Sequence, residues 1–345
     1  MEQRLTQLWY QEHPRPSLLQ PLGWLYGALM RVRRRAYASG WLRTAEAGVP
    51  VVVVGNLTVG GTGKTPLTIW LAQQLKGRGF SVGLVSRGYG RHGSGAARVV
   101  EMQSDWRDVG DEPLILARRS GCPTVVASDR AAGARLLAAR GVNLVLADDG
   151  LQHLRLARAC EIVVVDGARG FGNGRVLPAG PLREPLIQPL SADAVVVNGE
   201  AEHASLARWL TRGQALTMRL AAHEALCLDG TRPPRSLESF RGARVHAIAG
   251  IGNPPRFFRE LRARGLEVLE HAYPDHHACS AEELAFADGL PVLMTEKDAV
   301  KCARFATARL WYVPVAAQFS DADARELLTR VLAKLPDTAA PRGQR

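Results

Sequence analysis

The chain has 345 residues, with 44 Lys and Arg against 33 Asp and Glu and 46% hydrophobic residues, so its net charge is +11 and it can bury a sizeable core. This length predicts two domains, or one large domain with an appendage. The positive charge favours an anionic partner, such as a membrane surface or a phosphorylated small molecule. A general preference for arginine accounts for part of the excess of positive charge. We expect no nucleic-acid partner, because aromatic residues make up only 6% of the chain and no RNA- or DNA-binding signature occurs.

The first predicted element is an apolar helical stretch over residues 17–37 that ends in a basic cluster. Its apolar and basic residues are Leu18, Leu19, Leu22, Trp24, Leu25, Tyr26, Leu29, Met30, Arg31, Arg33, Arg34 and Arg35. One interpretation is a helix lying on an anionic membrane surface. The other is a docked helix whose arginines complement its own C-terminal dipole. Trp24 and Trp41 flank the cluster and favour the membrane interface.

No apolar run approaches the roughly 18 residues that a membrane-spanning helix needs. The first residues, Met-Glu-Gln-Arg-Leu-Thr, also lack a cleavable signal pattern. We therefore expect the protein on the cytoplasmic side of the membrane. We also expect it to be a monomer.

A phosphate-binding loop follows the β-branched run 51–54. It comprises Thr58, Val59, Gly60, Gly61, Thr62, Gly63, Lys64 and Thr65, and a helical pattern begins near Pro66. In this strand–loop–helix context the backbone amides and the helix N-terminus face a nucleotide phosphate. Lys64 would reach the β- and γ-phosphates, and the Thr65 hydroxyl would bind Mg²⁺.

Two features of this loop are unusual. Thr58 stands where the Walker pattern has glycine, which leaves a plain glycine-rich turn as the alternative. The chain has only five lysines, the other 39 cations being arginines. The use of lysine at position 64 therefore indicates a need for a compact ammonium group.

From residue 49 onward, short apolar strands alternate with helical stretches. The strands are predicted over 50–55, 81–86, 123–127, 143–148, 161–166 and 194–198, and a second series has strands over 244–249, 266–271, 291–295 and 310–315 and helices over 255–264 and 280–288. This pattern predicts an α/β fold of P-loop NTPase type, with a mostly parallel sheet covered by helices on both faces. The expected segments are an N-terminal helical segment (1–48), a P-loop domain (49–228) and a smaller α/β domain (229–345). The irregular stretch 167–191 is expected to be a functional loop.

Acidic residues follow one of these strands and one loop. Asp148 and Asp149 end the strand over 143–148, where P-loop proteins place the acid that serves Mg²⁺, and Gln152 and His153 follow at the same sheet edge. The alternative for either acid is a helix N-cap. Asp111 precedes Pro113 and, from local sequence alone, reads as an ordinary N-cap.

Arginines mark two further loops. Arg87 follows a strand and stands beside glycines, which suits either a phosphate contact or a plain turn. Arg183 and Glu184 end the irregular loop, where they would position a substrate phosphate or form a solvated pair.

Histidines and rare lysines gather in the second domain. Asp275, His276 and His277 follow His271, and this order suits proton transfer better than zinc, because the local sequence completes no tetrahedral ligand set. The five cysteines are scattered without metal spacing and are expected as reduced, mostly buried thiols. Lys297 and Lys301 hint at an anion or substrate contact.

Taken together, these motifs resemble those of the tetraacyldisaccharide 4′-kinase family, the lipid A kinases of Gram-negative bacteria. The similarity runs through the whole chain and rests on the ordered segments 55–66, 86–90, 110–113, 148–153, 181–184, 250–254, 275–277 and 295–298. The P-loop alone is generic, but this ordered set is specific. Thr58 agrees with the family loop.

The resemblance implies ATP-dependent, Mg²⁺-assisted phosphorylation of the 4′-hydroxyl of a tetraacylated glucosamine disaccharide 1-phosphate. It also implies an enzyme peripheral to the inner membrane, whose N-terminal helix meets the bilayer. The position of Asp111 matches a family aspartate that pairs with a histidine matching His276 to act as base. Asp148 and Asp149 match positions that organise Mg²⁺ and phosphate, and closure of the two domains would bring these groups together.

Two other functions share the P-loop and the acidic strand end. One is a P-loop transferase or ligase acting on a soluble metabolite, which the apolar N-terminal helix disfavours. The other is a nucleotide-switched assembly factor, which the absence of a guanine-binding Asn-Lys-x-Asp motif disfavours in its GTP form.

Overall fold

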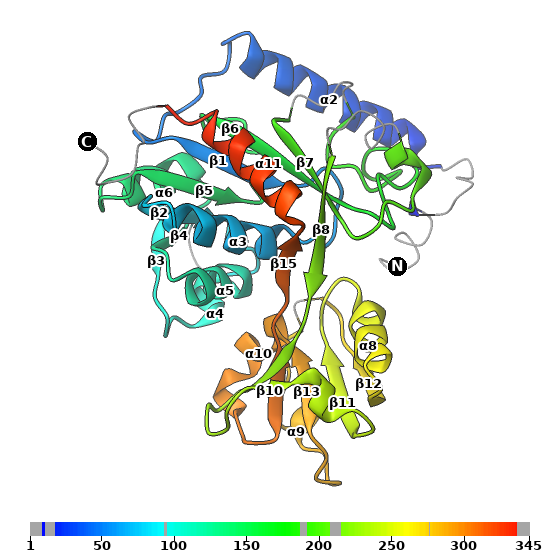
Figure 1. Ribbon diagram of the computed structural model, residues 1–345. Coiled ribbons are helices and arrows are strands. Elements are labelled where there is room, and N and C mark those ends of the chain that lie inside the picture. Colours follow the sequence, from blue (N-terminus) through cyan, green and yellow to red (C-terminus); the bar gives the residue numbers. More distant parts are fainter. Residues whose placement is uncertain are drawn as a thin grey trace.

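The computed structural model describes residues 9–10, 18–92, 95–186, 192–207, 215–275 and 277–336. Within these residues the chain forms two lobes, each built on its own sheet (Figure 1). The larger sheet has the strand order β15-β8-β7-β6-β1-β5-β2-β4-β3, and the smaller has the order β10-β9-β14-β13-β11-β12.

The strands of the large sheet are β1 (Val51–Gly55), β2 (Val82–Ser86), β3 (Arg98–Val100), β4 (Thr124–Val126), β5 (Leu144–Asp148), β6 (Cys160–Asp166), β7 (Ala194–Asn198), β8 (Ala215–Ala221) and β15 (Ala316–Phe319). They pair in parallel from β8 to β4, and antiparallel pairs occur only at the two ends, β8 with β15 and β4 with β3. The predicted mostly parallel α/β fold is therefore confirmed.

Helices cover both faces of this sheet because its central strands are apolar on both sides. In β1, Val52 and Val54 pack into one core while Val51 and Val53 pack into the other. The first core is covered by α3 (Lys64–Lys76), α5 (Asp111–Ser120) and α11 (Asp321–Leu332). The second is covered by α6 (Arg130–Ala138).

The small lobe contains β9 (Glu224–Cys227), β10 (Arg235–Ser236), β11 (Arg244–Ala249), β12 (Glu267–Ala272), β13 (Val292–Thr295) and β14 (Leu310–Val313), with helices α8 (Pro254–Ala263), α9 (Ala281–Leu284) and α10 (Glu296–Cys302). The helix expected over 280–288 is shorter, because α9 ends at Leu284. The remaining short helices are α4 (Trp106–Val109) and the 3-10 turns η1 (Ala204–Leu206), η2 (Leu237–Phe240) and η3 (Ala303–Phe305).

The strand pairing corrects the predicted domain limits. β9 already belongs to the small sheet, and after β14 the chain returns to the large sheet through β15 and α11. The return is driven by burial, since Ala317, Leu327 and Val331 join the core of the large lobe. The predicted domain over 229–345 is thus confined to the part between β9 and β14. The lobes are joined by two chain crossings, β8 to β9 and β14 to β15 (Figure 1).

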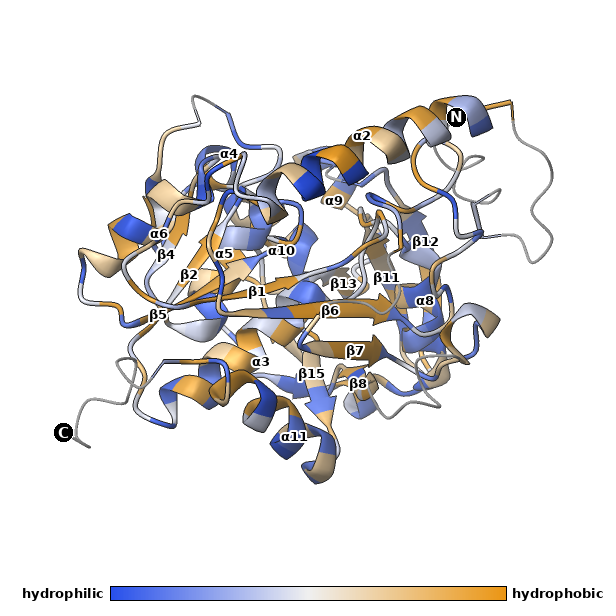
Figure 2. Ribbon diagram, turned by 90° about the horizontal axis from the view of Figure 1, so that it is seen from above, coloured by the Kyte–Doolittle hydropathy of each residue, from blue (hydrophilic) through white to orange (hydrophobic). Residues whose placement is uncertain are grey.

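The predicted N-terminal helix is present as α2 (Gln20–Ala38), which lies along one side of the large lobe (Figures 1 and 2). Gly23 and Gly27 let it approach the loop at Val176 and Ala179, because a Cβ at either glycine would lie 3.1–3.3 Å from atoms of that loop. Among the described residues, no helix is long and apolar enough to cross a membrane.

Candidate active site

The phosphate-binding loop connects β1 to α3 in the way its sequence predicts. Gly60 and Gly63 have φ of 101° and 98°, a left-handed conformation that favours glycine. Thr58 instead forms an antiparallel bridge with Leu182 and is buried. The position that is glycine in the Walker pattern is here an extended, paired residue, which explains why threonine fits.

Lys64 is the first residue of α3 and points back over the loop. Its Nζ lies 3.1 Å from Asn56 Oδ1 and 3.6 Å from Asp149 Oδ1. The ammonium group is therefore held between two oxygen atoms at the C-terminal ends of β1 and β5. Asn56 was not singled out by the sequence, although it directly follows β1.

Two distant residues hold the carbonyl groups of the loop. Asn198, at the end of β7, donates from Nδ2 to the Thr62 carbonyl at 3.0 Å. Arg169 donates to the Gly61 carbonyl and also pairs with Asp166 at 3.0 Å. With these carbonyls bound from outside, the loop can turn backbone amides toward a ligand.

Asp148 ends β5 beneath the loop. Its carboxylate accepts hydrogen bonds from the hydroxyls of Thr65 (3.4 Å) and Thr68 (3.1 Å). Burial, followed by the nearby negative charge of Glu112, raises the pKa of Asp148 to about 7. Among the described residues, only hydroxyl groups bind this buried carboxylate. Together with Thr65 it is an oxygen-donor set that fits a divalent cation such as Mg²⁺.

Asp149 has a different environment from its neighbour. Its φ of 51° turns it out of the strand, and Arg183 Nη1 donates to both carboxylate oxygens at 2.7 and 2.9 Å. Burial alone would raise the pKa of Asp149, but Lys64 and Arg183 outweigh it and lower the pKa to about 2. Asp149 is therefore an ionised group already paired with two cations.

Arg183 and Glu184 of the irregular loop connect this site to α2. Gln152 Nε2 donates to Glu184 Oε1 at 2.9 Å, and Arg34 of α2 pairs with Glu184 Oε2 at 3.0 Å. Tyr26 of α2 donates to the Arg183 carbonyl at 2.8 Å. Of the two interpretations for Arg183 and Glu184, the solvated pair is wrong, because both side chains bind site residues. Their predicted substrate contact stays a prediction.

On the opposite side, the start of α5 meets the small lobe. Glu112 forms an ion pair with Lys297 of α10. Asp111 is buried, and its Oδ1 accepts a hydrogen bond from the Glu112 amide at 2.8 Å. It is the first residue of α5, whose N-cap is Gly110, so the expected N-cap role of Asp111 is wrong. Asp275 is exposed on the small lobe, and His276 lies outside the described residues. The expected pair of Asp111 and His276 therefore stays a prediction.

A cavity of about 290 Å³ separates the two lobes at this point. Its polar side is formed by the phosphate-binding loop, Glu112, Asp275 and Lys297. Its other side includes the apolar residues Leu220, Ile251, Phe257, Val313 and Val315, together with the charged residues Arg256 and Glu260. Such a cavity suits a ligand with a charged end and a flat apolar end.

The second rare lysine of the small lobe has a structural role. Lys301 Nζ lies 3.0 Å from Asp298 Oδ1, and the two side chains are 1% and 0% exposed. The expectation that Lys301 contacts an anionic ligand is therefore wrong, because its partner is a neighbouring carboxylate inside the lobe.

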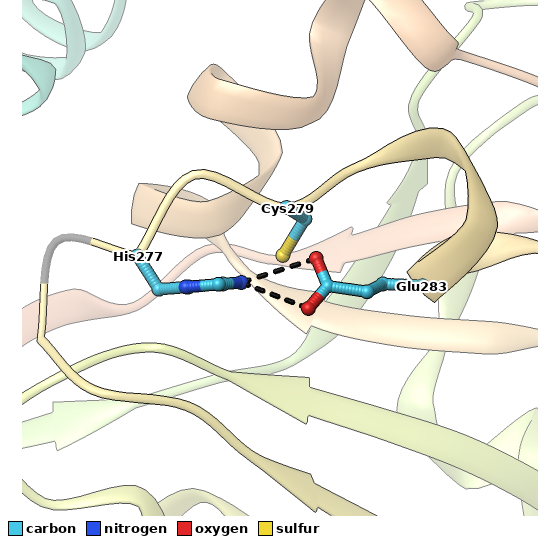
Figure 3. Close-up of side chains that lie close together, drawn as sticks. All are labelled: His277, Cys279 and Glu283. Atoms are coloured by element: carbon cyan, nitrogen blue, oxygen red, sulfur yellow. Dashed lines mark hydrogen bonds and ion pairs between the residues drawn. The ribbon is translucent and has the colours of Figure 1, made fainter.

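The fold also assembles side chains that the sequence leaves apart. His277, Cys279 and Glu283 place one nitrogen, sulfur or oxygen atom each within 4.8 Å of one another (Figure 3). His277 Nε2 lies 3.1 Å from both Glu283 oxygens, and Glu283 also accepts from the Ser280 amide in a capping box. These hydrogen bonds give His277 and Glu283 a structural role at the start of α9.

Arg87 follows β2 and His153 follows β5, and Gly88, next to Arg87, packs against Gly110 at the start of α5. Arg87 is exposed, whereas His153 is partly buried. Burial, then the charges of Arg130 and Arg87, lower the pKa of His153 to about 4. The imidazole is therefore neutral at pH 7 in a positively charged environment. Arg130 is a further residue that the sequence did not single out.

Comparisons with known proteins identify the family of this chain. The family model described as tetraacyldisaccharide-1-P 4′-kinase (LpxK) matches residues 15–333. The chain belongs to the tetraacyldisaccharide 4′-kinase family. A tetraacyldisaccharide 4′-kinase of Alkalilimnicola ehrlichii is 49% identical over 96% of this chain and 97% of its own length. One of Pseudomonas aeruginosa is 48% identical over 91% of this chain and 92% of its own.

A solved structure agrees with the family assignment. The crystal structure of LpxK from Aquifex aeolicus in complex with ATP matches with a TM-score of 0.76 and 28% identity, covering 92% of this chain and 98% of that one. The resemblance predicted from the ordered motifs is thus confirmed at the level of the tetraacyldisaccharide 4′-kinase family and its fold.

Proposed function

We propose that this chain transfers the γ-phosphoryl group of ATP to the 4′-hydroxyl of tetraacyldisaccharide 1-phosphate, a step of lipid A biosynthesis. The observation that carries the proposal is the position of the phosphate-binding loop. Lys64, Thr65 and Asp148 meet at the mouth of a cavity between two lobes, in a chain whose family members are named for this kinase activity. A metabolite kinase or an assembly factor has no comparable support.

The nucleotide fits the cavity between the lobes in one orientation. Its phosphates would meet the loop amides and Lys64, because a P-loop binds phosphate through these groups. Its base would lie against the apolar side near Ile251 and Phe257. Both lobes would thereby contact one ATP molecule.

Mg²⁺ would be held by Thr65 and Asp148. The two side chains offer oxygen donors 3.4 Å apart, and Asp148 has no cationic hydrogen-bond donor among the described residues. Asp149, predicted as a second Mg²⁺ ligand, is already paired with Lys64 and Arg183. We therefore propose that Asp149 orients these two side chains and does not bind the metal. When bound, the metal neutralises charge on the phosphate oxygens.

Asp111 is our proposed general base for the acceptor hydroxyl. It is buried at the start of α5, beside the Glu112–Lys297 pair that lines the cavity. Proton acceptance needs a carboxylate within hydrogen-bond reach of the hydroxyl. His276 of the small lobe would orient or assist it, as the family resemblance implies.

The acceptor carries acyl chains, and α2 offers a surface for a membrane. Leu18, Leu22, Leu25, Leu29 and Val32 recur on one side of the helix and are all exposed, Leu25 to 70%. Arg31 and Arg35 are also exposed. We propose that this side of α2 lies in the anionic inner-membrane surface and brings the site to its lipid substrate.

The direct test is phosphate transfer to the purified lipid. Incubation with radiolabelled ATP, Mg²⁺ and tetraacyldisaccharide 1-phosphate in detergent should give a labelled bisphosphorylated lipid. The Lys64→Met variant should form none. ATP hydrolysis that proceeds equally with and without the lipid, and leaves it unlabelled, would contradict the proposed acceptor.

A further inference from the structure

Arg130 is a buried cation whose hydrogen bonds are mostly unmade. The residue opens α6, directly after β4, and its side chain is 2% exposed. Nη1 donates to the Ala127 carbonyl, but Nε and Nη2 are buried and have no hydrogen-bond partner. An unsatisfied buried guanidinium destabilises a fold, so its presence needs a reason.

The charge around Arg130 is not balanced by the protein. Burial lowers the pKa of Arg130 to about 10, which leaves the group charged at pH 7. The charges of Arg87 and Arg91 act in the same direction as burial, while those of Asp149 and Asp148 oppose it. Asp149 is already paired with Lys64 and Arg183. Among the described residues, Lys64, Arg130 and Arg183 thus all act on Asp149, Arg87 lies near Arg130, and we assign Asp148 to Mg²⁺.

The positions of Arg87 and Arg130 in the sheet place this positive charge on the side where the acceptor substrate would bind. The C-terminal ends of β1, β5, β2 and β4 lie along one sheet edge in that order. The phosphate-binding loop follows β1, whereas Arg87 and Arg130 follow β2 and β4. Ligands of open α/β sheets bind along this edge. With the nucleotide placed over β1, toward the small lobe, the ends of β2 and β4 are left for the second substrate.

We propose that Arg130, together with Arg87, binds a phosphate group at the acceptor side of the site. The ligand is a phosphate monoester anion, which a guanidinium recognises through charged hydrogen bonds. The phosphate oxygens would accept hydrogen bonds from Nε and Nη2. Both nitrogen atoms are buried, so the side chains that cover them shift when the anion enters. The proposal rests on the proposed kinase function, and it leaves two sources for the phosphate, the acceptor's 1-phosphate and the phosphoryl group being transferred.

Stability distinguishes a ligand-binding arginine from a structural one. Arg130→Met keeps the length of the side chain and removes the buried charge. The free variant should melt at the same temperature as the wild type or higher, because an unsatisfied cation is lost. In the presence of MgADP, which occupies the phosphate-binding loop, inorganic phosphate should raise the melting temperature of the wild type but not of the variant.

Kinetics then identify the source of the phosphate. We expect Arg130→Met to lower kcat/KM for tetraacyldisaccharide 1-phosphate by about 10- to 100-fold, the effect of losing charged hydrogen bonds, with the KM for ATP within about twofold. If Arg130→Met no longer lowers kcat/KM with an acceptor that lacks the 1-phosphate, the 1-phosphate is the ligand of Arg130. If Arg130→Met still lowers kcat/KM with that acceptor, the transferred phosphoryl group is the ligand. Arg130→Lys should recover part of the activity.

The matched control is Arg135→Met, an exposed arginine of the same helix whose Nη1 bonds to the Glu46 carbonyl. It should behave as the wild type in every assay. The proposal is overturned if Arg130→Met melts lower than the wild type but keeps its kinetic constants and its response to phosphate. The melting assay needs no lipid, so it still decides on Arg130 if the wild type fails to phosphorylate the lipid and the proposed function falls.

Discussion

Lys64 shows how a composition bias becomes a prediction about one residue. The chain uses arginine for 39 of its 44 basic residues, yet Lys64 fills the space between Asn56 and Asp149. A guanidinium there is larger, planar and unable to act as a point charge. We expect Lys64→Arg to lower kcat by about a hundredfold or more, as does the loss of an electrostatic contact in other active sites.

Lys76 provides the matched control for this substitution. It ends the same helix and donates from Nζ to the Ser120 carbonyl at 3.0 Å, far from the phosphate-binding loop. Lys76→Arg should retain normal rates in the same steady-state kinase assay. Equal activity of Lys64→Arg and the wild type would mean that charge alone, and not ammonium geometry, is needed at position 64.

Asp148 and Asp298 are both buried carboxylates, but among the described residues Asp298 forms a close ion pair and Asp148 accepts no hydrogen bond from a cation. Asp298 pairs with Lys301, whereas Asp148 is bound by two hydroxyl groups. Asp148→Asn should therefore stabilise the free protein, by about 1–3 kcal/mol, while abolishing kinase activity. Asp298→Asn should destabilise it, by about 3–5 kcal/mol, because Lys301 is left as an unpaired buried charge. Urea unfolding without nucleotide or divalent cation measures both signs, and two shifts of the same sign would refute this difference.

The residues predicted from sequence are those that share a local motif. The phosphate-binding loop and Asp148 were recognised because strand, loop and helix are contiguous. Asn198 and Arg130 were missed because their roles depend on neighbours far along the chain. Asn198, for example, binds the carbonyl of Thr62, 136 residues earlier. Without the sheet order, nothing in the local sequence marks either residue.

At the scale of elements, the structure confirms that α2 is docked, whereas its contact with a membrane stays a prediction. Its inner side is docked on the large lobe through Gly23, Gly27 and the Arg34–Glu184 pair. Its outer side exposes a row of leucines. The helix is therefore attached to the active-site loop and also free to contact a second surface.

The leucine row gives a test of membrane contact. Replacing Leu22, Leu25 and Leu29 with Gln should reduce binding to anionic phospholipid vesicles by at least about tenfold, because a leucine transferred from water gains about 1.5–3 kcal/mol when fully buried. ATP binding should not change. Met102, which is exposed between β3 and α4, supplies a control as Met102→Gln. Unchanged co-sedimentation of the triple variant would exclude the row as the membrane contact.

Strand prediction succeeded where β-branched residues form short apolar runs and failed at the lobe junction. The four valines of β1 are all buried, which produces an unambiguous pattern. β8 instead alternates buried and exposed residues around Thr217 and Arg219, and β15 has only four residues, Ala-Ala-Gln-Phe. Whether such segments form strands depends on their pairing with each other, and local propensity does not reveal this pairing.

At the scale of the molecule, the two lobes meet through ion pairs as well as through the chain crossings. Arg119 at the end of α5 pairs with Glu296 at the start of α10 at 2.9 Å, and both side chains are largely shielded from solvent. Glu296 also lines the cavity proposed for ATP. A pair that spans the lobes next to the ligand should favour the arrangement in which both lobes contact it.

Reversing the charges of this pair tests whether it controls the lobes. Arg119→Glu places two carboxylates face to face, so we expect more open lobes, a larger radius of gyration in solution scattering and a KM for ATP raised about 3- to 10-fold, the range of a 1 kcal/mol contact. The double variant Arg119→Glu with Glu296→Arg should restore both values. If the double variant is no better than the single one, the effect belongs to Arg119 alone and the pair does not hold the lobes together. Recovery of scattering and KM in parallel would instead show that the same contact sets the lobe arrangement and the affinity for the nucleotide.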